Sequence, residues 1–102
     1  QLGEFEELVL LIVGGLKGEA YSLSIREELR KSANRNPSIG ALHSALNRLE
    51  EKSFITSEEK GATKERGGRR KRYYEITAQG KAALTNSYEL RNSWYHLIPD
   101  MK

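Results

Sequence analysis

The sequence lacks cysteine altogether and holds only two histidines, His43 and His96, among its 102 residues. Without cysteine it has no disulfide framework and no thiolate metal site. The two histidines do not form the His-x-x-x-His spacing of a helical zinc site, so we expect neither a metal nor a cofactor. Because no Ser/His/Asp set, phosphate-binding loop or dinucleotide fingerprint occurs either, we expect no enzyme activity.

Long apolar runs are also missing. No stretch approaches the roughly 20 apolar residues that a membrane-spanning helix needs. The longest run, Leu8 to Val13, lacks a basic segment before it and a small-residue cleavage site after it, so it does not match a signal peptide. We therefore expect a cytoplasmic protein with no membrane partner, which the absence of cysteine also fits. Since the first residue is Gln1 rather than Met, we expect further residues to precede it.

Positive charge is concentrated in one segment. The chain has a formal net charge of +3, yet residues 60–72 hold seven Lys and Arg side chains against a single Glu, which gives +6. The other 89 residues therefore sum to −3. A local basic patch is the electrostatic footprint of nucleic-acid binding. The segment is thus a candidate DNA contact, with a solvated charge run as the alternative.

The most informative predicted helix covers residues 38–52. Ile39, Leu42, Leu46 and Leu49 are spaced by 3, 4 and 3, which predicts one buried stripe, and Ser38 is the expected N-cap. The opposite face carries small or hydrogen-bonding residues without firm charge: Gly40, Ala41, His43, Ser44 and Asn47. A helix covered only by solvent more often shows Lys, Glu and Gln there, so this face is typical of a helix that packs against a polar partner.

Two further helices are predicted before this one. The first carries a wide apolar face, which indicates burial on more than one side: Phe5, Leu8, Val9, Ile12, Val13 and Leu16, extended by Leu10 and Leu11. The second begins near residues 22–24, where Ser24 and Glu27 have capping-box spacing, and runs to about Lys31.

A hairpin and a last helix follow. Residues 54–58 and 72–76 are β-branched or aromatic and have strand length, and a Gly-rich basic stretch separates them. Thr77 is the expected cap of a helix from 78 to about 98, which Pro99 ends. Along it, spacings of 4 and 3 indicate a coiled-coil seam made of Ala83, Ser87, Leu90, Trp94, Leu97 and Met101.

The expected fold class is mainly α with a small β-hairpin. Three helices followed by a hairpin predict a winged helix-turn-helix domain over residues 1–77, with the wing at 54–76 and the third helix as the DNA reader. Residues 78–102 then form a C-terminal dimerisation helix.

These segments resemble the PadR-like family of bacterial transcriptional regulators. The similarity rests on these motifs: Phe5-Glu-Glu-Leu-Val-Leu-Leu, Ala20-Tyr21, Ser38-x-Gly40-x-Leu42-x-x-x-Leu46-x-Arg48-Leu49-Glu50-x-Lys52, Glu65-Arg-Gly-Gly-Arg69 and Arg72-Tyr-Tyr-x-Ile-Thr-x-x-Gly80. The resemblance implies a homodimer whose C-terminal helices pack across the two-fold axis, and repression by operator binding. Family members usually carry Tyr where this chain has His43. Many carry Gly at the position of Ser53, where a left-handed conformation is expected after the helix.

The predicted DNA contacts come from the central helix and from the wing. Asn47 is expected to bond adenine, Ala41 to touch a thymine methyl, and Arg48 either to meet phosphate or to pair with an acid of its own domain. The recognition-helix set is Ser38, Gly40, Ala41, His43, Ser44, Asn47 and Arg48. The wing set, which would enter the minor groove or clamp phosphates, is Lys64, Arg66, Arg69, Arg70, Lys71 and Arg72.

Trp94 has two possible roles: an anchor of the dimer seam, or one half of a sandwich that holds a planar aromatic or phenolic effector between two subunits. The residues assigned to this interface are Phe5, Tyr88, Leu90, Trp94, Tyr95 and Leu97. The predicted function is therefore a dimeric, sequence-specific DNA-binding repressor that an effector releases from double-stranded operator DNA. The alternative is a winged-helix module that binds protein or RNA.

Overall fold

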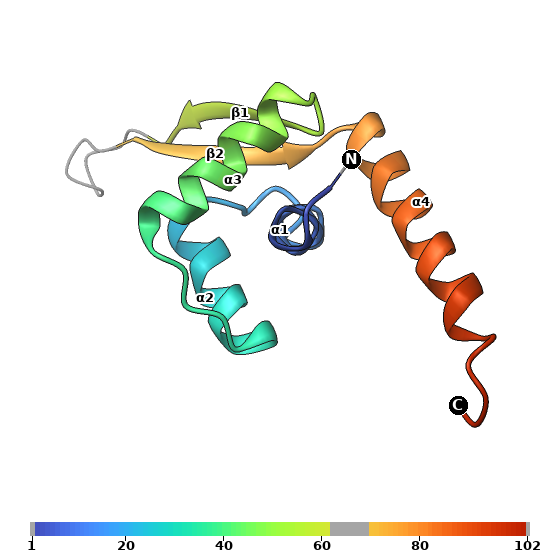
Figure 1. Cartoon of the computed structure of the whole chain (residues 1–102). Coiled ribbons are helices and arrows are strands. Elements are labelled where there is room, and N and C mark those ends of the chain that lie inside the picture. Colours follow the sequence, from blue (N-terminus) through green and yellow to red (C-terminus); the bar gives the residue numbers. More distant parts are fainter. Residues whose placement is uncertain (1, 62–69, 102) are drawn as a thin grey trace.

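The computed structural model describes residues 2–61 and 70–101. In chain order the elements are α1 (Glu4–Gly15), α2 (Ser22–Ala33), α3 (Ile39–Glu51), β1 (Ile55–Lys60), β2 (Lys71–Ile76) and α4 (Ala78–Tyr95) (Figure 1). This order confirms the predicted fold class of four helices and one β-hairpin. No helix in the described ranges is long and apolar enough to cross a membrane.

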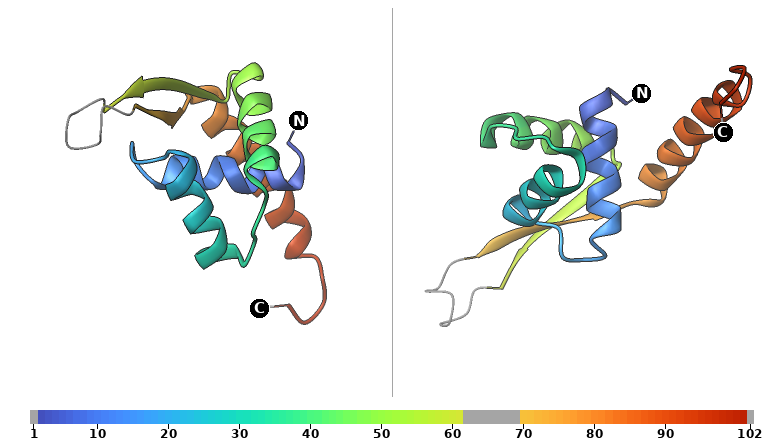
Figure 2. Two further views of the ribbon diagram at one scale, coloured as in Figure 1. Left: turned by 90° about the vertical axis from the view of Figure 1, so that its left-hand side faces the viewer. Right: turned by 90° about the horizontal axis from the view of Figure 1, so that it is seen from below.

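Helix α1 lies at the centre of the molecule, with α2 and α3 on one side and α4 on the other (Figure 2). Val9, Leu10 and Val13 are fully buried because they face α2, α3 and the base of the hairpin. Leu11 points elsewhere and remains 50% exposed. The unusually wide apolar surface of α1 therefore serves the core on one side and leaves an apolar residue free on the side of α4.

The buried stripe of α3 differs from the predicted one at two positions. Ser38 caps the helix as expected, since its hydroxyl accepts a hydrogen bond from the Ala41 amide at 3.0 Å. The prediction that Ile39 is a core residue is wrong: it opens the helix, before the turns that pack on the core, and is 46% exposed. Ala45 is fully buried instead, because it follows Leu42 by three residues and lies on the same face.

Helix α2 begins at Ser22, within the predicted range, but it is capped differently from the prediction. The expected Ser24–Glu27 capping box is absent, because Ser24 lies inside the first turn and Tyr21 is the N-cap. The Tyr21 amide donates to the Ser24 hydroxyl oxygen at 2.9 Å, and that hydroxyl donates to the Glu19 carbonyl at 2.8 Å. Glu27 pairs with Arg30 one turn further along the helix. Ser24 thus connects the preceding turn to the helix start, so Tyr21 is held at a fixed point beside the hairpin.

The hairpin is antiparallel, and its register runs from Ile55 opposite Ile76 to Lys60 opposite Lys71. Both strands continue one or two residues further toward the tip than predicted. The Tyr74 amide also donates to the Ala20 carbonyl at 2.8 Å, which adds a short third partner to β2. The base of the wing is therefore attached by backbone bonds to the residue just before Tyr21.

The junction between α3, the hairpin and α4 is tightly built. Ser53 has φ 65°, which confirms the expected left-handed conformation after the helix. Thr77 caps α4 as predicted, accepting from the Gly80 amide at 3.0 Å, and its hydroxyl donates to the Ser53 carbonyl at 2.6 Å. A Cβ on Gly80 would overlap the Phe54 carbonyl oxygen and lie 2.8 Å from Ile76. Only glycine lets the first turn of α4 approach the hairpin this closely.

Helix α4 leaves the body of the protein at an angle, and its far end lies away from the other helices (Figure 2). The helix ends at Tyr95, three residues before the predicted end. The amides of Leu97 and Ile98 donate to the carbonyls three residues earlier, so the chain tightens into turns before Pro99. Leu97 and Met101 therefore lie beyond the helix, and the regular part of the predicted seam stops at Trp94.

Candidate nucleic-acid interface

The exposed face of α3 carries the small and polar residues that the sequence placed there. Gly40, Ala41, His43, Ser44 and Asn47 are all exposed, as is Ser38 at the cap. No neighbour in the described part of the chain lies within 4 Å of the position that a Gly40 Cβ would occupy, so another molecule can approach the backbone at the start of the helix. This face offers hydrogen-bonding groups and open backbone without a fixed charge.

Residues at the start of α2 extend this face, and the sequence analysis missed them. The His43 Nε2 atom is hydrogen-bonded to the Ser22 hydroxyl at 2.9 Å, which fixes the imidazole against α2. Leu23, next in the chain, is a strongly exposed leucine on the same side. The Ala20-Tyr21 motif just before Ser22 was a signal for this region, but the sequence does not show which residues of α2 face the same way as His43.

A groove connects these helices to the wing. It has a volume of about 470 Å³ and is lined by the start of α2, the middle of α3 and the hairpin: Tyr21, Ser22, Leu23, His43, Asn47, Glu59, Arg70, Lys71, Arg72 and Tyr74. His43 and Asn47 therefore lie in one surface with Arg70, Lys71 and Arg72, although 23 or more positions of sequence separate them. Lys64, Arg66 and Arg69 of the predicted wing set lie outside the described residues.

The three described cations of the wing set have different surroundings. Arg70 is exposed at the end of β2. The Lys71 ammonium lies over the ring of Tyr21, 4.0 Å from its centroid. Arg72 is bound across the hairpin, donating to the Ser57 hydroxyl at 2.9 Å and to Glu59 at 3.3 Å. Arg70 is thus open to solvent and Lys71 lies against an aromatic ring, whereas the charge of Arg72 is partly neutralised within the protein.

Arg48 also has a partner in its own domain. Its Nε atom donates to Glu6 of α1 at 2.6 Å, and Lys52 donates to the other oxygen of Glu6 at 2.7 Å. Glu6 is buried, and burial raises its pKa, but the Lys52 and Arg48 contacts outweigh burial and hold the pKa below the ordinary value of 4.5. Of the two roles open to Arg48, the geometry therefore favours the ion pair within the domain.

The model of the Transcriptional regulator PadR-like family matches residues 9–86, which is more than three quarters of the chain. The chain belongs to the PadR-like family. This family consists of transcriptional regulators, so the protein is a regulator and not an enzyme.

Solved structures of PadR-like proteins have the same fold. A PadR family transcription regulator from Clostridium difficile aligns with a TM-score of 0.79 and 25% identity over 93% of this chain and 94% of that one. A PadR-like transcription factor from Bacteroides fragilis aligns with a TM-score of 0.70 and 29% identity over 91% and 82% of the two chains. Curated protein sequences gave no match. The first alignment shows that this is the short form of the PadR-like fold, with one C-terminal helix.

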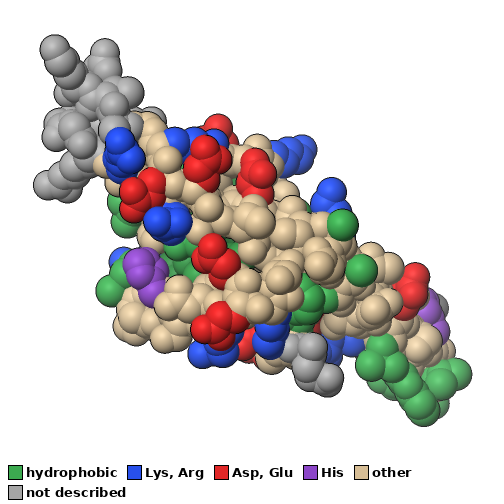
Figure 3. Space-filling model, turned by 90° about the horizontal axis from the view of Figure 1, so that it is seen from above, with side chains coloured by type: hydrophobic (Ala, Val, Ile, Leu, Met, Phe, Trp, Pro, Cys, Tyr) green, Lys and Arg blue, Asp and Glu red, His purple; other side chains and the backbone are tan. Residues whose placement is uncertain are grey.

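A second surface of this PadR-like regulator lies on α4 and is apolar. Leu90 is 61% exposed and Trp94 is 65% exposed, and both Leu97 and Ile98 beyond the helix end are also exposed. Figure 3 shows hydrophobic side chains gathered at the end of the molecule formed by the C-terminal segment. An apolar surface of this kind on a short chain is typical of a protein–protein contact.

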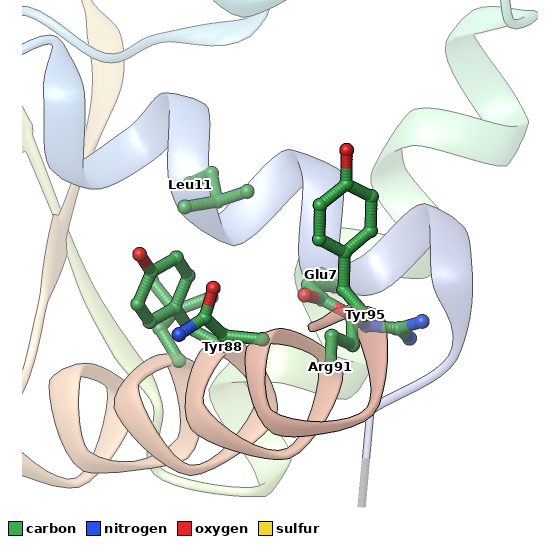
Figure 4. A pocket seen from close by; sticks show the side chains of 7 residues that line it. Glu7, Leu11, Tyr88, Arg91 and Tyr95 are labelled. Carbon is green, nitrogen blue, oxygen red and sulfur yellow. The ribbon is translucent and has the colours of Figure 1, made fainter. Parts of the chain in front are cut away.

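A hollow of about 290 Å³ lies between α1 and α4 (Figure 4). Leu11 and Glu7 of α1 face Tyr88, Arg91 and Tyr95 of α4 across it. Glu7 is the acceptor at its base, bonded by the Ser87 hydroxyl at 3.0 Å and by Arg91 at 3.3 Å. The hollow thus combines aromatic and aliphatic walls with one carboxylate.

Phe5, which the sequence analysis grouped with Tyr88 and Tyr95, lies elsewhere. The Arg35 guanidinium stands 5.4 Å from the centroid of its ring, and Phe5 lines a separate hollow beside the loop that leads into α3. Leu90, Trp94 and Leu97 do not line the hollow between α1 and α4 either. Tyr88 and Tyr95 are therefore the two residues of the predicted effector set that this hollow brings together.

Proposed function

We propose that this PadR-like regulator is a homodimeric repressor that reads operator DNA with α3 and holds the duplex with its wing. The observation that carries the proposal is the uncharged, exposed face of α3, which lines one groove with three cations of the hairpin. Neutral hydrogen-bonding side chains discriminate between bases, and cations bind phosphates of any sequence. The two surfaces therefore divide specificity and affinity between them.

The residues of α3 have distinct roles in this proposal. Asn47 pairs with an adenine edge, Ala41 contacts a thymine methyl, and Gly40 lets the backbone approach the duplex. Ser38, His43 and Ser44 contact phosphates or base edges at the same helix end. Arg48 does not contact DNA in this proposal; it holds α3 in place through its ion pair with Glu6 of α1.

The wing supplies the electrostatic part of the affinity. Arg70 and Lys71, together with Lys64, Arg66 and Arg69 of the predicted wing set, contact phosphates or the minor groove on the flank of the site. Arg72 contributes less to the affinity, because its charge is partly neutralised by Glu59. If a dimer neutralises about eight phosphates, the logarithm of the binding constant falls with the logarithm of salt concentration at a slope near −7.

We propose that the exposed face of α4 is the dimer contact. Leu90, Trp94 and Leu97 bury apolar surface against a second copy of the chain, as the family resemblance implies. A planar aromatic or phenolic effector then binds at this interface, against Trp94 or in the hollow of Tyr88 and Tyr95. Titration of the single tryptophan with planar cationic and phenolic compounds tests for the effector, since a ligand stacked on Trp94 changes its fluorescence.

The central experiment is an electrophoretic mobility shift with DNA from the promoter of the protein's own operon. We expect salt-sensitive binding that an unrelated fragment of equal length does not compete away. Binding that is absent, or equal on both fragments, contradicts operator recognition and favours the winged-helix protein or RNA module. Binding to RNA and to duplex DNA of the same sequence separates those two alternatives.

A further inference from the structure

The end of the hairpin farthest from its base carries two lysines directly opposite each other. Lys60 of β1 and Lys71 of β2 are paired in the antiparallel register, so both side chains lie on the same face of the hairpin. Like charges at directly opposed positions destabilise a hairpin. Two ammonium groups at these positions cost stability, but together they can bind an anion.

Aromatic rings accompany both lysines. Lys71 lies 4.0 Å from the ring centroid of Tyr21, and Lys60 lies 4.9 Å from the ring centroid of Tyr73. The two rings meet edge to face, with centroids 5.4 Å apart. A cation over an aromatic face is attracted by the ring and loses some of its freedom to rotate. Among the described residues, each ammonium is thus held by a ring and pairs with no carboxylate.

Tyr21 belongs to the helix-turn-helix part of the fold, whereas Lys71 and Tyr73 belong to the wing. The backbone bond from Tyr74 to Ala20 holds the strand next to Tyr21, and the bond from the Tyr21 amide to Ser24 fixes Tyr21 at the start of α2. Lys71 and Tyr73 lie two residues apart on one face of β2, and the Tyr21 ring contacts both. The position of the Lys71 ammonium therefore depends on a residue outside the wing.

We propose that Tyr21 is a positioning residue for DNA binding, which holds the Lys71 ammonium at the far end of the strands so that it meets a phosphate beside the bases that α3 reads. This inference rests on the proposed operator binding. Lys71 and Asn47 line the same groove, so one duplex contacts both. The ring, and not the phenol hydroxyl, carries the effect.

The geometry is tested first without DNA. In NMR spectra of protein isotopically labelled on lysine, the Hε proton signals of Lys71 are assigned by their absence in Lys71→Met. The Tyr21 ring should shift these signals upfield relative to those of the exposed Lys81 of α4. The shift should persist in Tyr21→Phe and disappear in Tyr21→Leu. An unshifted Lys71 signal in the wild-type protein overturns the inference.

The functional test is a salt titration of operator binding for Tyr21→Phe, Tyr21→Leu, Lys71→Met and the double variant. Lys71→Met should make the salt slope shallower by about 1.8, because a dimer loses two phosphate contacts. Tyr21→Leu should make the salt slope shallower by at least half as much as Lys71→Met does. It should not change the slope further when Lys71 is already Met, and Tyr21→Phe should have the slope of the wild-type protein. Thermal unfolding of each variant shows whether a loss follows from misfolding.

Lys60→Met is the matched control, since Lys60 lies on the ring of Tyr73 and not on that of Tyr21. Its effect should add to that of Tyr21→Leu. If the effect of Tyr21→Leu on the salt slope adds fully to that of Lys71→Met, as it does to that of Lys60→Met, Tyr21 does not position Lys71. The proposal of operator binding is not affected by that result. A wild-type protein that binds no DNA at any salt concentration overturns both proposals.

Discussion

Glu6 and Arg48 join the two helices that matter most to this fold, with a carboxylate oxygen of Glu6 2.6 Å from the Arg48 Nε atom. Lys52, one turn further along α3, holds the other oxygen at 2.7 Å. The neighbouring residue, Glu7, bonds Ser87 and Arg91 of α4. Two consecutive carboxylates of α1 thus connect it to α3 on one side and to α4 on the other.

Replacing Glu6 by Gln should lower the free energy of unfolding at pH 7 by about 1–2 kcal/mol, because two charge-assisted hydrogen bonds are weakened and both cations are partly exposed. The pKa of Glu6 in the folded protein lies below 4.5, so its contribution is present above that pH and is lost as the pH falls through the lower, folded value. As the pH falls from about 5 to about 3, the variant should therefore lose less free energy of unfolding than the wild-type protein does. Urea unfolding across this range, with the exposed Glu89→Gln as the control, measures both effects; identical pH profiles for Glu6→Gln and the wild-type protein contradict the assignment.

Two apolar positions of α3 should respond very differently to truncation. Leu46→Ala removes a fully buried side chain and should cost about 2–5 kcal/mol. Ile39→Ala removes a side chain that is nearly half exposed and should cost less than about 1 kcal/mol. Chemical denaturation of the two variants distinguishes them, and equal costs would show that Ile39 is buried in solution.

Asn47→Ala should reduce the preference for operator over unrelated DNA with little change in the salt slope. Asn47 carries no charge, and a lost bidentate contact to one base costs about 1–3 kcal/mol of discrimination. Competition titrations with both DNA fragments at two salt concentrations provide the measurement. A uniform loss of affinity on both fragments, with an altered slope, is the result that speaks against base reading by Asn47.

Leu90→Ser should weaken self-association, since Leu90 lies on the apolar face of α4. Leu23→Ser is a closely matched control, because Leu23 is 64% exposed against 61% for Leu90 but lies at the start of α2. Sedimentation equilibrium should show a shift toward monomer for Leu90→Ser alone. A dimer that survives Leu90→Ser and Trp94→Ser unchanged excludes this face as the contact.

Local patterns in the sequence predicted most of the fold. The 3- and 4-residue spacings located α1 and α3, the caps Ser38 and Thr77 located two helix starts, and the φ of Ser53 followed from its place after α3. Errors arose where the pattern does not show which residues meet the core or which local hydrogen bond a side chain makes. Ile39 has the right period but lies beyond the core, and Ser24 bonds a preceding carbonyl instead of capping the helix.

The candidate site was predictable in composition but not in arrangement. The neutral face of α3 and the basic wing are visible as residue types, because each lies on one continuous segment. The contacts of Tyr21 with Lys71, of His43 with Ser22 and of Arg48 with Glu6 each join residues at least 21 positions apart. A single sequence carries no periodic signal for such pairs, so they depend on how the helices pack.

The missing side chain of Gly80 has a consequence for DNA geometry. Because the first turn of α4 packs against the Phe54 carbonyl at Gly80, this contact helps to set the angle of the helix. The helix extends about 22 Å from Gly80 to Tyr95, so a tilt of about 10° displaces its far end by about 4 Å. That displacement is close to the rise of one base pair, about 3.4 Å. In a dimer joined through α4, a methyl group at residue 80 would therefore alter the spacer length that the operator requires between its two half-sites.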